Sequence, residues 1–240
     1  MIHPAAATGF ARGADAYERA RPDYPPEAIS WLAAELDLGP GRVVVDLAAG
    51  TGKLTRPLAA LGCDVIAIEP VAAMRARIGA GVRALAGTAE ATGLPDSSAD
   101  AVTVGQAFHW FDAPAALAEI ERVLRPGGAL ALVWSSRPVE ASALHRAIEA
   151  IVAPYRHDAP VHASGAWRAG LVGRELVERR FPFSQQRDAD ALADRVGSTS
   201  VIAALGDAER AAVLERVRAL APDGPVELPY VCEVYVWRPG

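Results

Sequence analysis

Two acidic residues and the glycine turn between them have the clearest chemical role in this sequence. Asp46 ends an apolar run of valines just before the turn Gly50-Thr51-Gly52, and Glu69 ends a second apolar run farther along the chain. A β-branched run that ends in an acid and breaks into a glycine turn before a helix is how an α/β protein opens a nucleotide site. The sequence therefore predicts a nucleotide-like ligand at this turn.

The surroundings of the turn indicate the charge of that ligand. A dinucleotide turn needs a third small residue beneath the pyrophosphate, and Thr55 stands at that position. Asp46 also lies where the negative pyrophosphate would approach, so an acid there suits a cationic ligand. Glu69 is placed to accept hydrogen bonds from both hydroxyls of a ribose. An adenosine that carries a sulfonium and an ammonium group, S-adenosylmethionine, fits both acids.

The elements that position these acids follow from the apolar pattern. The run from Val43 is apolar at consecutive positions, as expected for a central parallel strand covered on both faces. Five alternations of strand and helix imply an α/β fold with a Rossmann-like, doubly wound and mostly parallel sheet, and helices on both faces. Further strands are expected over 64–69, 82–86, 99–106 and 129–134, with helices over 54–61, through Met74 and Ile78, and through Leu117, Ile120 and Leu124.

The pattern changes beyond residue 136. A helix is expected over 141–155, a strand over 176–186, helices around 190–205 and 207–220, and a last strand over 227–237. Pro182 confines the first of these strands to an edge of the sheet. The last strand alternates apolar residues and is expected to pair antiparallel beside the fifth strand. Asp207 is expected to cap its helix, and His145, His157 and His162 are interpreted as surface or loop residues.

The N-terminal segment allows two interpretations. Residues 13–38 are expected to form two helices, joined by a stretch from Tyr17 to Pro25 that is rich in tyrosine, arginine and proline. That stretch is either a stiff surface connector or a helical lid that folds over the glycine turn and supplies Tyr17 and Arg21 to it.

Length and composition favour one domain and a small-molecule partner. The 240 residues, 51% of them hydrophobic, suit a single domain made of a lid (1–38), a cofactor-binding core (39–135) and a segment that completes the sheet and the acceptor pocket (136–240). The net charge of −5 and the lack of a basic run argue against nucleic acid or membrane partners. The first residues do not resemble a leader and no apolar run reaches about 20 residues, so a cytoplasmic location is expected. The two cysteines lack the paired spacing of a metal site, so no metal is expected. The oligomeric state stays open.

Several motifs occur in a fixed order along the chain. They are VVVDLAAGTG at 43–52, Ile68-Glu69-Pro70, Gly87-Thr88-Ala89-Glu90, the stretch from Gly105 to Phe111, and Leu124-Arg125-Pro126-Gly127-Gly128. In this order the chain resembles the class I S-adenosylmethionine-dependent methyltransferases, in particular the ubiquinone-biosynthesis-like group that acts on small molecules. The resemblance covers at least residues 13–134.

The resemblance implies methyl transfer from S-adenosylmethionine, with S-adenosylhomocysteine as product, and a set of cofactor contacts. Implied contacts are Asp46, Ala48 and Gly50 for the methionyl part, Glu69 for the ribose, Pro70 and Met74 beside the adenine, Thr88, Ala89 and Glu90 at its polar edge, Gln106 and Ala107 under the sulfonium, and Gly52 in the turn. Two positions depart from the family pattern. Ala48 replaces the first glycine of the turn and is tolerable only if its φ is not positive, and Thr88 replaces a frequent aspartate.

Methyl transfer is an in-line displacement, so positioning in a dry cavity can supply most of the rate. His109 is the candidate general base if the acceptor needs one, and otherwise a wedge between strand and helix. The candidate acceptor pocket contains Tyr24, Phe108, His109, Trp110 and Trp167, with core packing as the favoured alternative for Trp167.

Two other functions stay open at this point. A nicotinamide-dependent oxidoreductase is disfavoured by Asp46 and Thr55. A protein that binds S-adenosylmethionine without transferring its methyl group, as a regulator or as a catalyst of another natural-product reaction, is not excluded. The acceptor, and whether its oxygen, nitrogen or carbon is methylated, does not follow from the sequence.

Overall fold

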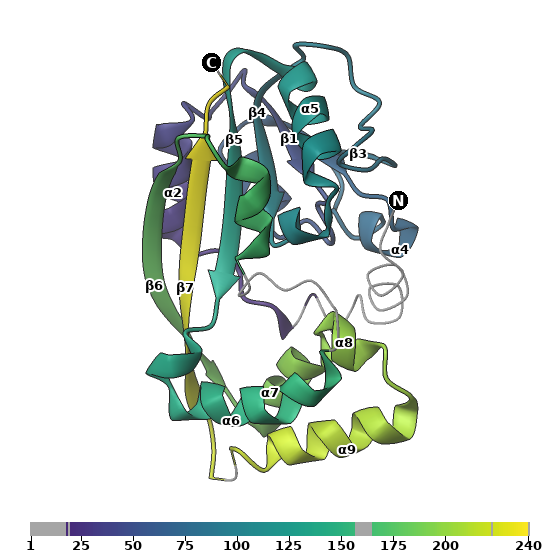
Figure 1. Cartoon of the computed structure of the whole chain (residues 1–240), viewed down its shortest axis with the longest axis vertical. Helices are drawn as coiled ribbons and strands as arrows, with labels where there is room; N and C mark the ends of the chain where they lie inside the picture. The colour runs from purple at the N-terminus through teal and green to yellow at the C-terminus, as the bar shows by residue number, and fades with distance from the viewer. Residues whose placement is uncertain (1–17, 19, 157–164, 222, 240) are drawn as a thin grey trace.

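A mixed seven-stranded sheet runs through the molecule (Figure 1). The computed structural model describes residues 18, 20–156, 165–221 and 223–239. The strand order is β3-β2-β1-β4-β5-β7-β6. The strands are β1 (Val43–Leu47), β2 (Asp64–Ile68), β3 (Arg83–Leu85), β4 (Ala99–Gly105), β5 (Leu124–Ser136), β6 (Val177–Arg187) and β7 (Val226–Trp237).

The pairing of these strands confirms the predicted sheet. Strands β1 to β5 pair in parallel, whereas β7 is antiparallel to both of its neighbours, β5 and β6. The last strand therefore lies inside the sheet next to β5, as its alternating pattern predicted. Strand β6, which contains Pro182, is at the edge, where a residue without an amide hydrogen costs least.

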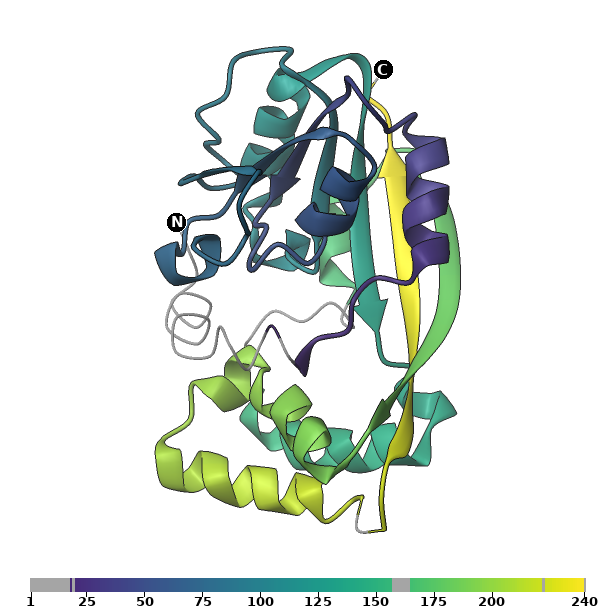
Figure 2. The same cartoon turned by 180° about the vertical axis from the view of Figure 1, so that it is seen from behind.

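Helices cover both faces of the sheet. Val44 packs in one core with α2 and α3, and its neighbour Val45 packs in a second core with α5, which explains why β1 is apolar at consecutive positions. Figure 2 shows α2 and α3 on the face opposite α5. The α-helices are α2 (Pro26–Glu35), α3 (Thr55–Ala60), α4 (Ala72–Arg75), α5 (Ala113–Val123), α6 (Ala143–Val152), α7 (Ala189–Gly197), α8 (Ser200–Ala203) and α9 (Asp207–Arg218), and the short 3₁₀ helices are η1 (Phe108–Trp110), η2 (Val139–Ala141), η3 (Ala153–Tyr155) and η5 (Ala166–Leu171). Within the described ranges, no helix has the length and apolar composition that a membrane span requires.

Helices α6 to α9 form a separate layer, here called the cap lobe. Residues 231–237 of β7 pair with β5, but residues 226–230 extend past β5 and pair only with β6. This overhanging hairpin shares a third core with α6, α7 and α9. In Figure 1 the cap lobe faces the carboxyl end of β5, and the parallel strands point toward the cap lobe. The fold therefore places a second wall against the edge of the sheet where a ligand is expected.

Several predicted ends of helices and strands were wrong, each for a local reason. Strand β5 begins at Leu124 instead of residue 129, because residues 125–128 bulge beside Asp100, whose carboxylate accepts a hydrogen bond from Arg125 at 2.7 Å. Helix α4 ends at Arg75, ahead of two glycines with positive φ. Residue 206, a glycine, is the N-cap of α9, and Asp207 is its first helical residue.

The prediction for His145 was also wrong. Its side chain is buried in α6, its Nδ1 lies 3.3 Å from the carbonyl oxygen of Pro138, and its ring packs edge-on against Tyr230. His157 and His162 lie outside the described residues.

Ala48 was expected to be tolerable in the turn only if its φ is not positive, and the structure shows a positive φ. Its φ is +52°, in the left-handed region, so the residue that replaces the first glycine of the turn adopts the conformation that glycine favours. A left-handed conformation costs a non-glycine residue about 1–2 kcal/mol. The turn is thus held by the surrounding structure against a local preference.

Replacement of Ala48 by glycine tests this strain. We expect Ala48→Gly to be more stable than Ala49→Gly by about 1–2 kcal/mol, because glycine relieves strain at position 48 and only adds chain entropy at position 49. The measurement is the free energy of unfolding of both ligand-free variants in urea. Equal destabilisation by both substitutions would contradict a strained Ala48.

Candidate active site

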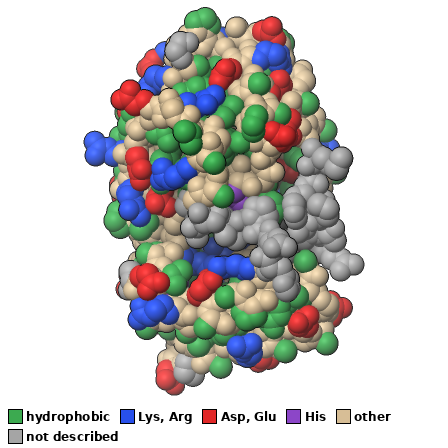
Figure 3. All heavy atoms as spheres, viewed as in Figure 1, with side chains coloured by type: hydrophobic (Ala, Val, Ile, Leu, Met, Phe, Trp, Pro, Cys, Tyr) green, Lys and Arg blue, Asp and Glu red, His purple; other side chains and the backbone are tan. Residues whose placement is uncertain are grey.

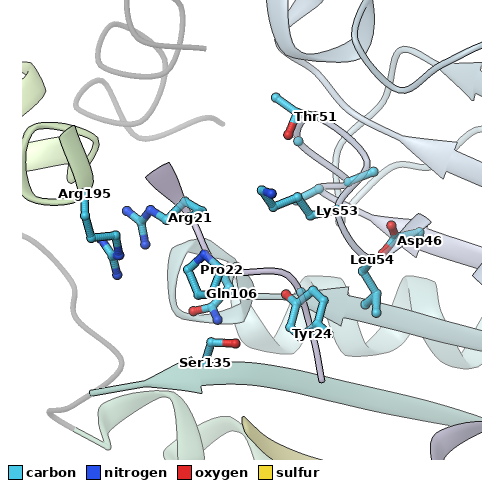
Figure 4. A pocket seen from close by; sticks show the side chains of 14 residues that line it. Arg21, Pro22, Tyr24, Asp46, Thr51, Lys53, Leu54, Gln106, Ser135 and Arg195 are labelled. Carbon is cyan, nitrogen blue, oxygen red and sulfur yellow. The ribbon is translucent and has the colours of Figure 1, made fainter. Parts of the chain in front are cut away.

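The pocket of interest opens at the topological switch point of the sheet. The strand order reverses between β1 and β4, and in open α/β sheets ligands bind outside the carboxyl ends of the strands at this point. Figure 4 shows the pocket from close by. Its lining consists of Arg21, Pro22, Tyr24, Asp46, Ala48, Ala49, Gly50, Thr51, Lys53, Leu54, Gly105, Gln106, Ser135 and Arg195.

Asp46 is a buried carboxylate at the base of this pocket. Thr55 donates a hydrogen bond to its Oδ2 at 2.6 Å, and Thr103 donates one to its Oδ1 at 3.0 Å. Burial raises the pKa of Asp46 to about 6, with a smaller contribution from the charge of Glu69, while the two hydroxyls act in the opposite direction. Thr55, which the sequence marked only as a departure from a dinucleotide turn, thus orients the acid. The side chain is a negative charge poorly compensated by solvent, which suits a cationic ligand.

Glu69 ties the end of β2 to the glycine turn. Its Oε2 accepts a hydrogen bond from the amide of Gly50, and its Oε1 accepts one from the amide of Val71, both at 2.8 Å. Burial raises the pKa of Glu69, although both amides oppose the shift. Each carboxylate oxygen retains a second lone pair, so the side chain can still accept hydrogen bonds from a diol.

Gly105 lets the N-terminal segment reach the end of β4. A Cβ atom at Gly105 would stand 2.7 Å from the hydroxyl of Tyr24, so any larger residue would displace the tyrosine. Gln106, the next residue, has a φ of +62° and donates its amide to the carbonyl oxygen of Val133 at 2.9 Å. The ends of β1 and β4 therefore both turn through left-handed backbone where they border the pocket.

The segment before α2 bridges the glycine turn and the cap lobe. The carboxylate of Glu18 accepts hydrogen bonds from the side chains of Thr51 and Arg56. Toward the cap lobe, Arg21 of the same segment donates a hydrogen bond to the carbonyl oxygen of Ser198 at 3.2 Å. These contacts place the described part of the segment between the glycine turn and the cap lobe. Tyr17, the other residue proposed for the lid, lies outside the described residues.

The structure brings part of the predicted site together. Six of the predicted residues line the pocket, namely Arg21, Tyr24, Asp46, Ala48, Gly50 and Gln106. Among the lining residues that sequence reasoning missed are Lys53, Ser135 and Arg195. No local signal identifies Arg195, because the cap lobe carries it to the pocket from far along the chain.

The residues predicted for the adenosine half lie beside the turn, outside that lining. Met74 and Ala89 are buried, and the Cε atom of Met74 would be 3.5 Å from a Cβ at Gly50. Glu90 accepts a hydrogen bond from the amide of Asp112 at 3.2 Å. Glu69, Pro70 and Thr88 belong to the same group, and Gly52 of the turn, against which Ile78 packs, also lies outside the lining.

Apart from Tyr24, the residues predicted for the acceptor pocket lie on the α5 side of the sheet. The His109 ring contacts Trp110 and Trp134 at centroid distances of 4.9 Å and 5.3 Å. Trp167 is buried 5.5 Å from Trp134, which agrees with its core alternative. Ala107 and Phe108 are buried in the same core. None of these side chains is part of the described pocket lining, and the position of His109 matches a wedge.

Removal of the charge of Asp46 should alter the pH dependence of stability. Because the pKa of Asp46 is about 6 in the folded chain and 3.8 ordinarily, folding takes up a proton between these values, and stability falls as pH rises through that window. Ligand-free Asp46→Asn should lack this fall and be more stable than wild type at pH 8, by at most about 3 kcal/mol. Urea unfolding between pH 4 and 8 measures the effect.

Asp100 provides a control of opposite sign. Although burial acts to raise the pKa of Asp100, the amide of Val43 and the guanidinium of Arg125 hold it below its ordinary value. Asp100→Asn should therefore destabilise the protein at neutral pH. An Asp46→Asn variant that loses stability between pH 4 and 6 as wild type does would contradict the role assigned to Asp46.

Known proteins resemble this chain in sequence and in fold. A methyltransferase domain family matches residues 45–132. An uncharacterized methyltransferase of Mycobacterium tuberculosis is 41% identical over 92% of each chain, and a methyltransferase-like protein of Schizosaccharomyces pombe is 34% identical over 87% of this chain and 84% of its own. The structure of a protein from Anaeromyxobacter dehalogenans, described as a type II methyltransferase, has a TM-score of 0.67, with 26% identity over 90% of this chain and 96% of that one.

The likeness to the mycobacterial relative extends over nearly the whole chain and well beyond the matched domain. The fold agrees with it independently, through the strand order and the antiparallel β7. The chain therefore belongs to the class I S-adenosylmethionine-dependent methyltransferases.

Proposed function

We propose that the protein transfers the methyl group of S-adenosylmethionine to a small-molecule acceptor held between the sheet and the cap lobe. The observation that carries the proposal is the buried Asp46 at the switch point, with the lid and the cap lobe forming the opposite wall. The pocket is closed on several sides by this chain, which suits a small molecule better than a polymer. Membership of the ubiquinone-biosynthesis-like group stays a prediction.

The residues of the pocket fit the charges of the cofactor. When bound, S-adenosylmethionine supplies a methyl group activated by a sulfonium. Asp46 attracts the cationic part, with Ala48, Gly50 and Gln106 bordering it, and Arg21 on the lid binds the carboxylate of the methionyl group.

The ends of β2 and β3 provide the adenosine contacts in this proposal. Glu69 accepts hydrogen bonds from the ribose hydroxyls through its remaining lone pairs. Met74, which now lies over Gly50, moves to admit the adenine. The other proposed contacts are Tyr17, Gly52, Pro70, Thr88, Ala89, Glu90 and Ala107.

Positioning and exclusion of water provide the catalysis in this proposal. Tyr24 and Pro22 on the lid cover the pocket, and Gly105 gives the tyrosine the room to do so. His109 would have to leave its contacts with two tryptophans to act as a base. We therefore assign His109, Phe108, Trp110 and Trp167 to the support of the β4 end and give the pocket-facing role to Tyr24.

The proposed compartment is the cytoplasm, in keeping with two free thiols.

Loss of Glu69 tests the cofactor site. We expect Glu69→Ala to weaken the binding of S-adenosylhomocysteine about 100-fold, because the ribose hydroxyls lose a charged acceptor. Titration calorimetry measures the affinity, and circular dichroism verifies the fold. The matched control is Glu119→Ala, which removes a carboxylate that accepts hydrogen bonds from the amide and hydroxyl of Thr92 away from the pocket. A folded Glu69→Ala variant with wild-type affinity would exclude the ribose role.

Proton release tests the contact between Asp46 and the cofactor. Because the pKa of Asp46 is about 6, a cationic ligand at pH 6 should displace protons from part of the molecules. The calorimetric enthalpy of S-adenosylmethionine binding at pH 6 should thus depend on the ionisation enthalpy of the buffer, and the affinity should fall below pH 6. Asp46→Asn should lose the buffer dependence. A buffer-independent wild-type enthalpy at pH 6 would argue against this contact.

A further inference from the structure

The pocket carries opposite charges at its two ends. Asp46 stands at the strand end, and the guanidinium groups of Arg21 and Arg195 lie near each other at the opposite end in Figure 4. Figure 3 shows basic side chains in the waist between the body of the sheet and the cap lobe. Lys53 also lines the pocket, but Asp23 neutralises it at 2.8 Å. The basic end therefore depends on the arginines.

Arg195 is a buried cation with an unused hydrogen-bonding atom. It extends from α7, its side chain is only 3% exposed, and its Nε donates a hydrogen bond to the hydroxyl of Tyr230 at 3.2 Å. In the described part of the chain, its Nη1 is buried without a hydrogen-bond partner, and no carboxylate pairs with it. The hydroxyl of Ser135, at the end of β5 in the same pocket, is likewise buried without a partner there.

Arg137, which is half-buried, adds a further positive charge whose field reaches Arg195. It follows β5 directly, and burial, together with the positive charges of Arg195, Arg21 and Arg156, lowers its pKa. Glu149 neutralises Arg156 at 2.6 Å, whereas no described carboxylate pairs with Arg137. A buried cation without a counterion, such as Arg195, is costly, because its desolvation is not offset. An anionic ligand would supply the missing counterion.

One carboxylate does not serve both Arg21 and Arg195. In the proposed function, Arg21 on the lid takes the carboxylate of the methionyl group, and Arg195 on the cap side remains. We infer that the methyl acceptor carries a carboxylate or phosphate group, which binds to Arg195 with the hydroxyl of Ser135 beside it. This inference rests on the proposed function, since it takes the Asp46 end as the cofactor site.

The geometry also gives the anion a function in positioning. A guanidinium binds a carboxylate or a phosphate through parallel hydrogen bonds, which fixes orientation as well as affinity. An acceptor anchored at Arg195 extends toward Asp46, so its methyl-accepting atom lies between the two charged ends. The cap lobe would thus select acceptors by charge, while the sheet binds the cofactor.

The test uses full-length protein saturated with S-adenosylhomocysteine. The probes are benzoate, its uncharged analogue benzamide, and inorganic phosphate, at constant ionic strength, with thermal stability and calorimetric affinity as readouts. We expect benzoate or phosphate, but not benzamide, to raise the melting temperature saturably, and the more effective anion shows whether the site takes a carboxylate or a phosphate. No saturable effect of either anion on the loaded wild type would overturn the inference.

Substitutions then assign the effect to Arg195. Arg195→Gln, which keeps a donor for Tyr230, should weaken anion binding about tenfold or more and leave the affinity for S-adenosylhomocysteine within about twofold of wild type. Arg195→Lys should retain part of the anion effect, and Arg216→Gln, an exposed arginine on α9, should behave as wild type. The melting temperature of anion-free Arg195→Gln should be unchanged or higher, which confirms folding.

The outcomes separate the inference from the proposed function. Undiminished anion binding by Arg195→Gln would overturn the inference alone. If Arg195→Gln instead weakens S-adenosylhomocysteine binding as strongly as Arg21→Gln does, Arg195 binds the carboxylate of the cofactor, and the inference also fails. If wild-type protein does not bind S-adenosylhomocysteine, the proposed function fails and the inference falls with it.

Discussion

The hydrogen bonds from Thr55 and Thr103 to Asp46 are the interactions on which the rest of the site depends. They join α3 and β4 to β1 at the point where the strand order reverses. At neutral pH this arrangement works against stability, because a buried carboxylate is disfavoured there and its pKa is raised to about 6. A protein gains from such a group when a cationic ligand compensates it, which is the situation that a sulfonium cofactor creates.

The same conflict between stability and binding recurs around Asp46. Ala48 has a positive φ at the turn, Gln106 has one at the end of β4, and Arg195 is a buried cation without a described counterion. Each departs from what local preference or burial favours, and all three line one pocket. Such departures concentrate where the surrounding fold determines the conformation and where function requires it.

Features that depend on local sequence patterns could be predicted, whereas features that depend on distant parts of the chain could not. The acids at the ends of β1 and β2, the parallel sheet, the edge position of Pro182 and the late antiparallel strand rest on local patterns, and the structure agrees with them. The φ of Ala48 did not follow from its residue type, because the whole turn determines it. Arg195 could not be assigned, since only the overhang of β6 and β7 brings the cap lobe to the sheet.

In the proposed function, this overhang lets one chain bind two ligands of different charge. The sheet edge supplies an acid and backbone turns, which are fixed by strand pairing, whereas the cap lobe, which has its own core, supplies Arg195. The lid contacts both parts, through Glu18 at the glycine turn and Arg21 at Ser198. Ligands at the two ends would therefore act on the same segment, so binding of the cofactor and binding of an anionic acceptor should be energetically coupled through the lid.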